Sequence, residues 1–111
     1  MAQAYKVTGF NITGADTKNT IYSCPASTTA LVNSVYFGNR DTQTGINDAA
    51  SLYLYDSSAA STYAIMSGVL LPGQASIQPL SAPLVLESGD YLQAADTSGF
   101  ADVTVNILEI T

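Results

Sequence analysis

The sequence contains no histidine and no tryptophan, and it has a single cysteine, Cys24. The missing histidine removes the commonest general base, the usual serine-histidine-aspartate arrangement and a frequent zinc ligand. One cysteine cannot form an intramolecular disulfide, and the sequence around Cys24 offers no base or cation that would make it a reactive thiolate. We therefore expect a protein that is not an enzyme, without a cofactor or metal, in which Cys24 is a small buried side chain.

Positive charge is also scarce, since only Lys6, Lys18 and Arg40 oppose nine acidic residues and the formal net charge is −6. Recognition of nucleic acid needs clustered lysine or arginine to replace counterions, so three scattered cations exclude it, and they disfavour anionic membranes for the same reason. No apolar run is long enough to span a bilayer, and no signal-peptide pattern opens the chain. With no disulfide to form, we expect assembly in the cytoplasm.

Charged residues of both signs make up 11% of the chain, whereas an ordinary soluble domain has about 25%. The polar remainder is mainly Ser, Thr, Asn and Gln, together with many Ala residues. Ser, Thr and Ala lose less rotamer entropy than Lys or Glu when they are immobilised, so they lower the cost of burying an interface. The composition favours a protein that makes close contacts, and a stable, weakly charged monomer is the alternative.

Segments that alternate apolar and polar residues recur about every ten residues and are separated by Gly, Pro, Asn, Asp and Ser. We expect strands at residues 5–13, 20–24, 30–38, 51–56, 63–71, 75–80, 84–86, 90–95 and 103–110. No segment has the period of a long helix, and there are no internal repeats or linkers. The pattern predicts one all-β domain over residues 1–111, an antiparallel β-sandwich of about eight strands, either jelly-roll-like or immunoglobulin-like.

Alternation also predicts which side chains face the core. In the segment 30–38 the inward set is Leu31, Asn33, Val35 and Phe37. In the last strand the inward set is Val103, Val105 and Ile107. The apolar phase then changes at Leu108 and Ile110, which predicts a bulge or an edge strand at that point.

The longest segment without apolar periodicity covers residues 39–50, and long loops are disproportionately functional. We therefore predict contact residues at Asn39, Arg40 and Asp41. Tyr53 and Tyr55 share one face of the following strand, whose other face is also apolar, and two apolar faces suggest a strand that lies under a partner. We add both tyrosines to the predicted interface.

Most acidic residues fall at strand ends or in turns: Asp16, Asp41, Asp48, Asp56, Glu87, Asp90, Asp96 and Asp102. Aspartate in turns hydrogen-bonds the local backbone and keeps strand edges soluble, so we expect these residues to be solvated. Two alternatives remain open. Asp41 and Asp48 with loop carbonyls are suitable ligands for calcium, and paired carboxylates on a sandwich are the machinery of a hydrolase.

Residues 21–39, IYSCPASTTALVNSVYFGN, resemble a pattern in the small β-sandwich virion proteins of tailed bacteriophages. In these proteins a strand ends in Tyr-x-x-Pro-Ala, and after a Thr-rich turn the next strand reads Ala-Leu-Val-x-Ser-Val. The matching positions here are Tyr22, Pro25, Ala26, Thr28, Thr29, Ala30, Leu31, Val32, Ser34, Val35 and Asn39. Residues 84–94, LVLESGDYLQA, resemble their late hairpin with its turn at Gly89 and Asp90, so the match covers most of the chain.

The resemblance implies a non-enzymatic structural protein of the virion, made and assembled in the host cytoplasm. Within that group the sequence is most similar to capsid decoration (cement) proteins, which implies docking on the major capsid protein and self-association, with a trimer as the expected oligomer. The alternative is a small tail or fibre component that binds a host surface glycan or another tail protein. Residues 1–6 are either an arm that reaches a neighbour or a frayed end.

Overall fold

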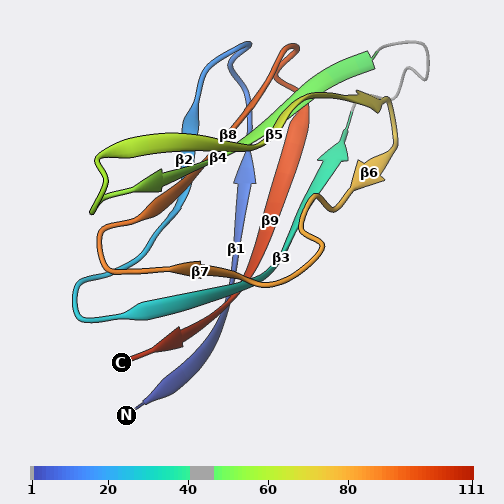
Figure 1. The fold of residues 1–111 in the computed structure, drawn as a ribbon. Coiled ribbons are helices and arrows are strands. Elements are labelled where there is room, and N and C mark those ends of the chain that lie inside the picture. The colour runs from blue at the N-terminus through green and yellow to red at the C-terminus, as the bar shows by residue number, and fades with distance from the viewer. Residues whose placement is uncertain (1, 41–46) are drawn as a thin grey trace.

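The structure is a computed structural model that describes residues 2–40 and 47–111. These residues form an all-β protein whose nine strands make two antiparallel sheets (Figure 1). The strands are β1 (Gln3–Asn11), β2 (Asn19–Ser23), β3 (Thr29–Asn39), β4 (Asn47–Asp56), β5 (Ser61–Pro72), β6 (Ser76–Ile77), β7 (Leu84–Leu86), β8 (Tyr91–Asp96) and β9 (Ala101–Ile110). No helix that could cross a membrane occurs in this part of the chain.

The strand order is that of a jelly roll. One sheet has the order β1-β9-β3-β6, with β7 also paired to β3, and the other has the order β2-β8-β4-β5. β1 pairs with β9, β2 with β8, β3 with β6 and β7, and β4 with β5. These pairs are those of one long antiparallel hairpin wrapped around a core. The chain changes sheet between successive strands except at β4–β5 and β6–β7, and this order excludes the immunoglobulin sandwich and decides between the two predicted sandwiches.

The core lies between the sheets and is filled by alternate residues of each strand. Val103, Val105 and Ile107 of β9 are at most 1% exposed, as predicted, and they face Leu52 and Leu92 of the opposite sheet in the same buried cluster. Each fully buried side chain of this size contributes about 1.5–3 kcal/mol. Cys24 is also buried, at 4% exposure, and burial raises the pKa of its thiol.

The predicted inward set of β3 is wrong in its first half, because the strand contains a bulge. Val32 pairs with Ile107 and Ser34 with Asn106, so Asn33 is an extra residue with no partner on β9. The bulge changes the alternation, and the inward residues are Ala30, Val32, Val35 and Phe37. Asn33 is therefore exposed, and Leu31 lies on the outer face of the sheet.

The bulge or edge predicted at Leu108 is also wrong. β9 is a central strand between β1 and β3, and its inward alternation continues at Glu109. The Glu109 carboxylate accepts a hydrogen bond from the Tyr22 hydroxyl and lies 3.6 Å from Lys6 Nζ. The outer face of β9 simply becomes apolar at Leu108 and Ile110.

Two predicted boundaries change. β3 continues to Asn39 and β4 begins at Asn47, so both ends of the long loop expected at 39–50 belong to strands. At the N-terminus, residues 3–6 are part of β1 and are neither an arm nor a frayed end, since Gln3 pairs with Ile110. Ala2 and Thr111 exchange backbone hydrogen bonds, which places the two chain ends side by side (Figure 1).

Candidate interaction surfaces

An apolar row crosses the outer face of the first sheet. The register places Tyr5 of β1 beside Leu108 of β9, Leu108 beside Leu31 of β3, and Leu31 beside Val85 of β7. Tyr5 is 81% exposed and Val85 is 56% exposed, while the two leucines between them are half-buried. Large contiguous apolar surfaces of this kind mark interaction sites on soluble proteins. We call these four residues the apolar row.

The outer face of the second sheet carries an aromatic surface instead. Tyr55 of β4 stacks on Tyr91 of β8, with ring centroids 4.6 Å apart and planes inclined by 15°. Two residues earlier on the same face, Tyr53 lies under Lys18, whose Nζ is 4.3 Å from the ring centroid. The predicted site residues Tyr53 and Tyr55 are thus together on one face, and Tyr91 and Lys18 complete it. We call these four residues the tyrosine face.

The sequence did not reveal Tyr91 and Lys18 as members of this surface. Tyr91 meets Tyr55 because the two residues are direct partners in the β4–β8 ladder. A pocket of about 140 Å³ lies beside Tyr53 and is bordered by Asp16 and Thr97 among others. Register between strands brings Tyr91 to Tyr55, and Lys18 reaches Tyr53 from the segment before β2, so alternation within single strands could not show either residue.

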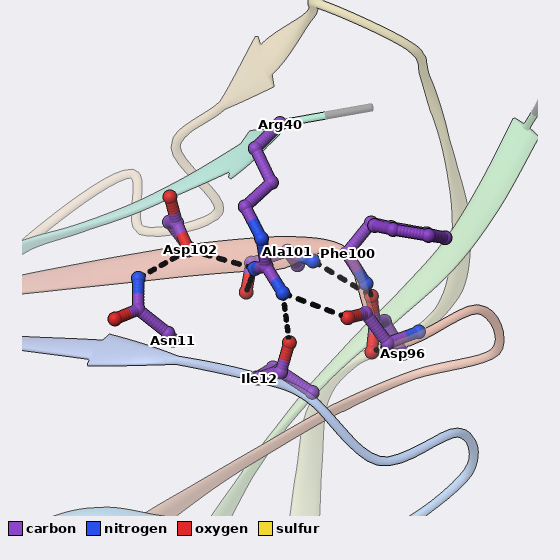
Figure 2. Close-up of polar contacts among 8 residues, drawn as sticks. Asn11, Ile12, Arg40, Asp96, Phe100, Ala101 and Asp102 are labelled. Atoms are coloured by element: carbon purple, nitrogen blue, oxygen red, sulfur yellow. Dashed lines mark hydrogen bonds and ion pairs between the residues drawn. The ribbon is translucent and has the colours of Figure 1, made fainter. Parts of the chain in front are cut away.

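Arg40 holds together one end of the sandwich (Figure 2). Its Nη1 donates to Asp102 Oδ1 at 2.8 Å and to the carbonyl of Ala101 at 3.1 Å. Its Nη2 donates to the carbonyls of Ile12 at 2.7 Å and Gly99 at 2.9 Å. The guanidinium therefore joins the end of β1 to the turn before β9 and to β9 itself, a role within the fold for a residue that we predicted as a contact residue.

Of the other two predicted loop residues, the structure describes Asn39, which is buried. Asn39 is 4% exposed, and its Nδ2 donates to the carbonyl of Leu71 at 2.9 Å. Asp41 lies outside the described residues. Of the predicted interface residues that the structure describes, Tyr53 and Tyr55 lie on the tyrosine face, and Asn39 and Arg40 lie at the end of β3.

Three aspartates predicted as solvated are buried, which corrects that expectation. Asp48, Asp90 and Asp96 are 0%, 5% and 1% exposed. Their carboxylates accept backbone N–H groups of the turns, as expected for aspartate in a turn, but the turns fold over them. Asp96, for example, accepts from the N–H groups of Gly99, Phe100 and Ala101 at 2.9–3.1 Å.

Asp90 joins two turns. Its Oδ1 accepts from the backbone N–H and the hydroxyl of Ser57, both at 2.9 Å, and its Oδ2 accepts from the N–H of Glu87 at 2.9 Å. Burial alone would raise the pKa of Asp90, but these hydrogen bonds outweigh burial and hold it below its usual value. The preceding Gly89 has φ 89°, and a Cβ there would lie 3.1 Å from Ser57 Oγ, so the tight turn requires glycine.

Asp48 and Asp96 form a buried carboxyl pair. Burial, with the hydrogen bond to Asp48 and its charge, raises the pKa of Asp96 to about 6. Burial opposes ionisation of Asp48 too, but hydrogen bonds from Asp96, Ser98 and Thr97 keep its pKa below the usual value. Asp48 Oδ2 is buried without a hydrogen-bond donor, and two carboxylates can bond only when one carries a proton. Below about pH 6, where Asp96 carries a proton, its hydroxyl can donate to Asp48.

The described residues bear on the calcium alternative and, at one buried pair, on the hydrolase alternative. No group of three or more Cys, Asp or Glu residues among them could hold a metal ion. A glycosidase needs two carboxyl groups about 5–10 Å apart with room for a sugar. Asp48 and Asp96 are instead 0% and 1% exposed, so a sugar cannot reach them.

The fold is shared with proteins of viral particles. A chain of the T13 particle of infectious bursal disease virus superposes with TM-score 0.60 and 9% identity, over 96% of this chain and 30% of that one. A chain of the Gx strain of the same virus gives TM-score 0.50 and 9% identity, over 98% and 37%. A pentameric capsid protein from metagenomic phage sequences gives 0.43 and 15%, over 91% and 63%.

This protein thus spans about a third of the two infectious bursal disease virus chains. At 9% identity the likeness establishes the β-sandwich and nothing finer. No family model and no curated protein matches the sequence.

Proposed function

We propose that this protein is a non-enzymatic structural component of a phage particle that decorates the capsid, and that it docks on the major capsid protein through the apolar row. The observation that carries the proposal is the row itself, which presents apolar side chains on an outer sheet surface that the chain's own core does not use. Its presence on a jelly roll that superposes on a chain of the infectious bursal disease virus particle supports a role in a viral particle.

The physical case for docking depends on the low cost of covering this surface. The apolar row contains no charged side chain, so a partner can cover it without desolvating a charge. The burial of apolar area then supplies the binding free energy, at about 25 cal/mol per Å² before the cost of association.

Binding to capsids tests this proposal. Purified protein is added to capsids that lack it, and their melting temperature and bound protein are measured. We expect the protein to raise the melting temperature and the variant Val85→Lys to bind at least tenfold more weakly. Val69→Lys is the matched control, because Val69 is 41% exposed on β5 of the other sheet. Capsids unchanged by the protein, or equal binding of both variants, would contradict the proposal.

The tyrosine face supports a second candidate, a tail or fibre component that binds a host surface glycan. Stacked tyrosines offer flat apolar surface, and the pocket beside Tyr53 adds polar groups of the kind that fix a ligand's orientation. We expect wild-type binding on a glycan array to be lost in Tyr53→Ala and Tyr55→Ala. Tyr63→Ala is the control, since Tyr63 is 51% exposed on β5. An array without signal would argue against this candidate.

Copy number separates the two candidates. Mass spectrometry and cryo-electron microscopy of intact virions would count and place the chain. Many copies spread over the shell would support the decoration role, whereas a few copies at the portal vertex or tail would support the second candidate. The resemblance predicts a trimer, and a mass measurement in solution decides between that trimer and the dimer inferred below.

A further inference from the structure

The two sheets have four edges, and three of them are interrupted. β2 is bulged between Thr20 and Tyr22, β5 has two register shifts against β4, and β6 and β7 are only two and three residues long. Bulges and short strands are devices that stop an edge from pairing with another chain. β1 is different, because its nine residues pair with β9 in unbroken register.

The backbone groups on the free side of β1 can be identified. Ala2 and Thr111 exchange both hydrogen bonds, and the N–H of Ile12 donates to the carbonyl of Ala101 at 2.9 Å. Hydrogen-bonded pairs alternate along an antiparallel ladder, so the even residues of β1 bond to β9 and the odd residues point outward. The outward residues are Gln3, Tyr5, Val7, Gly9 and Asn11. No strand in the described part of the chain pairs with them.

Side chains do not protect this edge either. Tyr5 is 81% exposed and Val7 is 67% exposed, both on the outer face, and Gly9 follows them without a side chain. The only charge on β1 belongs to Lys6, which lies on the other face of the sheet with its Nζ 3.6 Å from the carboxylate of Glu109. Lys6 is thus neutralised within its own sheet.

We propose that β1 pairs antiparallel with β1 of a second copy around a two-fold axis at Val7, which joins two sheets into one. This register is the one in which every outward residue of β1 gains a partner. Val7 pairs with Val7, Tyr5 with Gly9, and Gln3 with Asn11 of the second copy. Each Tyr5 ring then covers the bare backbone of a Gly9, a pairing that compensates for glycine in strands.

A second copy of this chain in the proposed register fits the edge better than a copy shifted along the strand or an open-ended assembly does. In the proposed register Lys6 lies opposite Thr8, so like charges do not face each other directly. The contact is isologous, and two copies close it and cover both free edges. The inference depends on the geometry of the edge and is independent of capsid docking.

Cysteine cross-linking tests the register. Directly opposed residues of a hydrogen-bonded pair have Cα atoms about 5.5 Å apart, within the range of a disulfide. Val7→Cys should therefore form a covalent dimer under mild oxidation. Tyr5→Cys should not, because its two copies would be four residues apart along the ladder, about 14 Å. A mixture of Tyr5→Cys and Gly9→Cys should cross-link. Absence of the Val7→Cys dimer, or equal cross-linking of Tyr5→Cys alone, would overturn the register.

Sedimentation gives the second readout. The wild type should be a dimer. Val7→Pro should weaken dimerisation at least tenfold, because proline lacks the N–H that points toward the second copy. The hydrogen bonds between β1 and β9 do not use this N–H and are kept. Thermal unfolding shows whether this variant is folded. Val85→Lys, on the same face at the opposite edge, should remain dimeric. A wild type that is monomeric at every concentration would overturn the proposal even if it binds capsids, and a dimer that does not bind capsids would leave this proposal intact.

Discussion

The carboxyl groups of Asp48 and Asp96 meet in the interior of the sandwich, where the two residues are 0% and 1% exposed. They come from β4 and from the end of β8, neighbouring strands of one sheet. Because both are buried, ionising both together is costly, and the fold is most stable when the pair keeps one proton.

This pair predicts that stability rises when the pH is lowered from about 7.5 to 5. The pKa of Asp96 is raised to about 6, so its contribution is fully present below the unfolded value and is lost as the pH rises through 6. The pKa values of Asp48 and Asp90 are lowered, so their contributions are lost only when the pH falls below the unfolded value. The melting temperature followed against pH should peak between these limits. A flat profile, or one that rises up to pH 7.5, would contradict this.

Asp48→Asn should stabilise the protein at pH 7.5 by about 1–2 kcal/mol and reduce the pH dependence, because it removes the charge beside Asp96. An amide nitrogen in the place of Oδ2 donates to Asp96, while the amide oxygen still accepts from Ser98, whose N–H lies 2.8 Å from Asp48 Oδ1. Denaturant unfolding at pH 5 and 7.5 measures both effects. Glu87→Gln is the control, because Glu87 is exposed and lies on a different turn. A loss of stability at both pH values in Asp48→Asn would show that the pair does not share a proton.

Arg40→Ala should cost about 2–3 kcal/mol of unfolding free energy, because it leaves carbonyls at the end of the sandwich without their charged donor. Arg40→Lys should recover little, since a single ammonium cannot span the acceptors that the planar guanidinium reaches. Urea unfolding compares these variants with Lys18→Ala, which removes a cation from an exposed position. If Arg40→Ala and Lys18→Ala lower the unfolding free energy equally, the Arg40 hydrogen bonds do not stabilise this end of the sandwich.

Gly89→Ala should lower the unfolding free energy by about 1–3 kcal/mol, because alanine does not easily adopt φ 89° and its Cβ would crowd Ser57 Oγ. Gly38→Ala is a matched control within a strand. No heavy atom lies within 4 Å of the added Cβ there, so we expect a change within about 1 kcal/mol. Thermal and urea unfolding of the two variants side by side provide the comparison, and equal effects would argue against strain at Gly89.

The sequence predicted the strands well because half-buried strands alternate, and that pattern is local. It did not predict the bulge at Asn33, because an extra residue is defined only against the partner strand β9. It also placed the start of β4 too late, since Asp48 is a polar residue that the fold buries and alternation cannot distinguish it from a loop residue.

The two candidate surfaces were also predictable only where they depend on a single strand. Tyr53 and Tyr55 were assigned to one face by alternation within a single strand. The stacking of Tyr55 on Tyr91 and the apolar row from Tyr5 to Val85 depend on register between strands that are distant in sequence. The four edges could be compared only when the order of the strands was known.

The paired chain ends have a practical consequence for attaching anything to this protein. Ala2 and Thr111 bond to each other at one end of a body with a longest extent of 48 Å. A peptide or fluorescent domain fused to either terminus would therefore leave from the same pole of the sandwich. Labels placed at the two termini in turn should report the same orientation on a particle, and a short linker from Thr111 to Ala2 would permit new termini to be opened in a turn elsewhere.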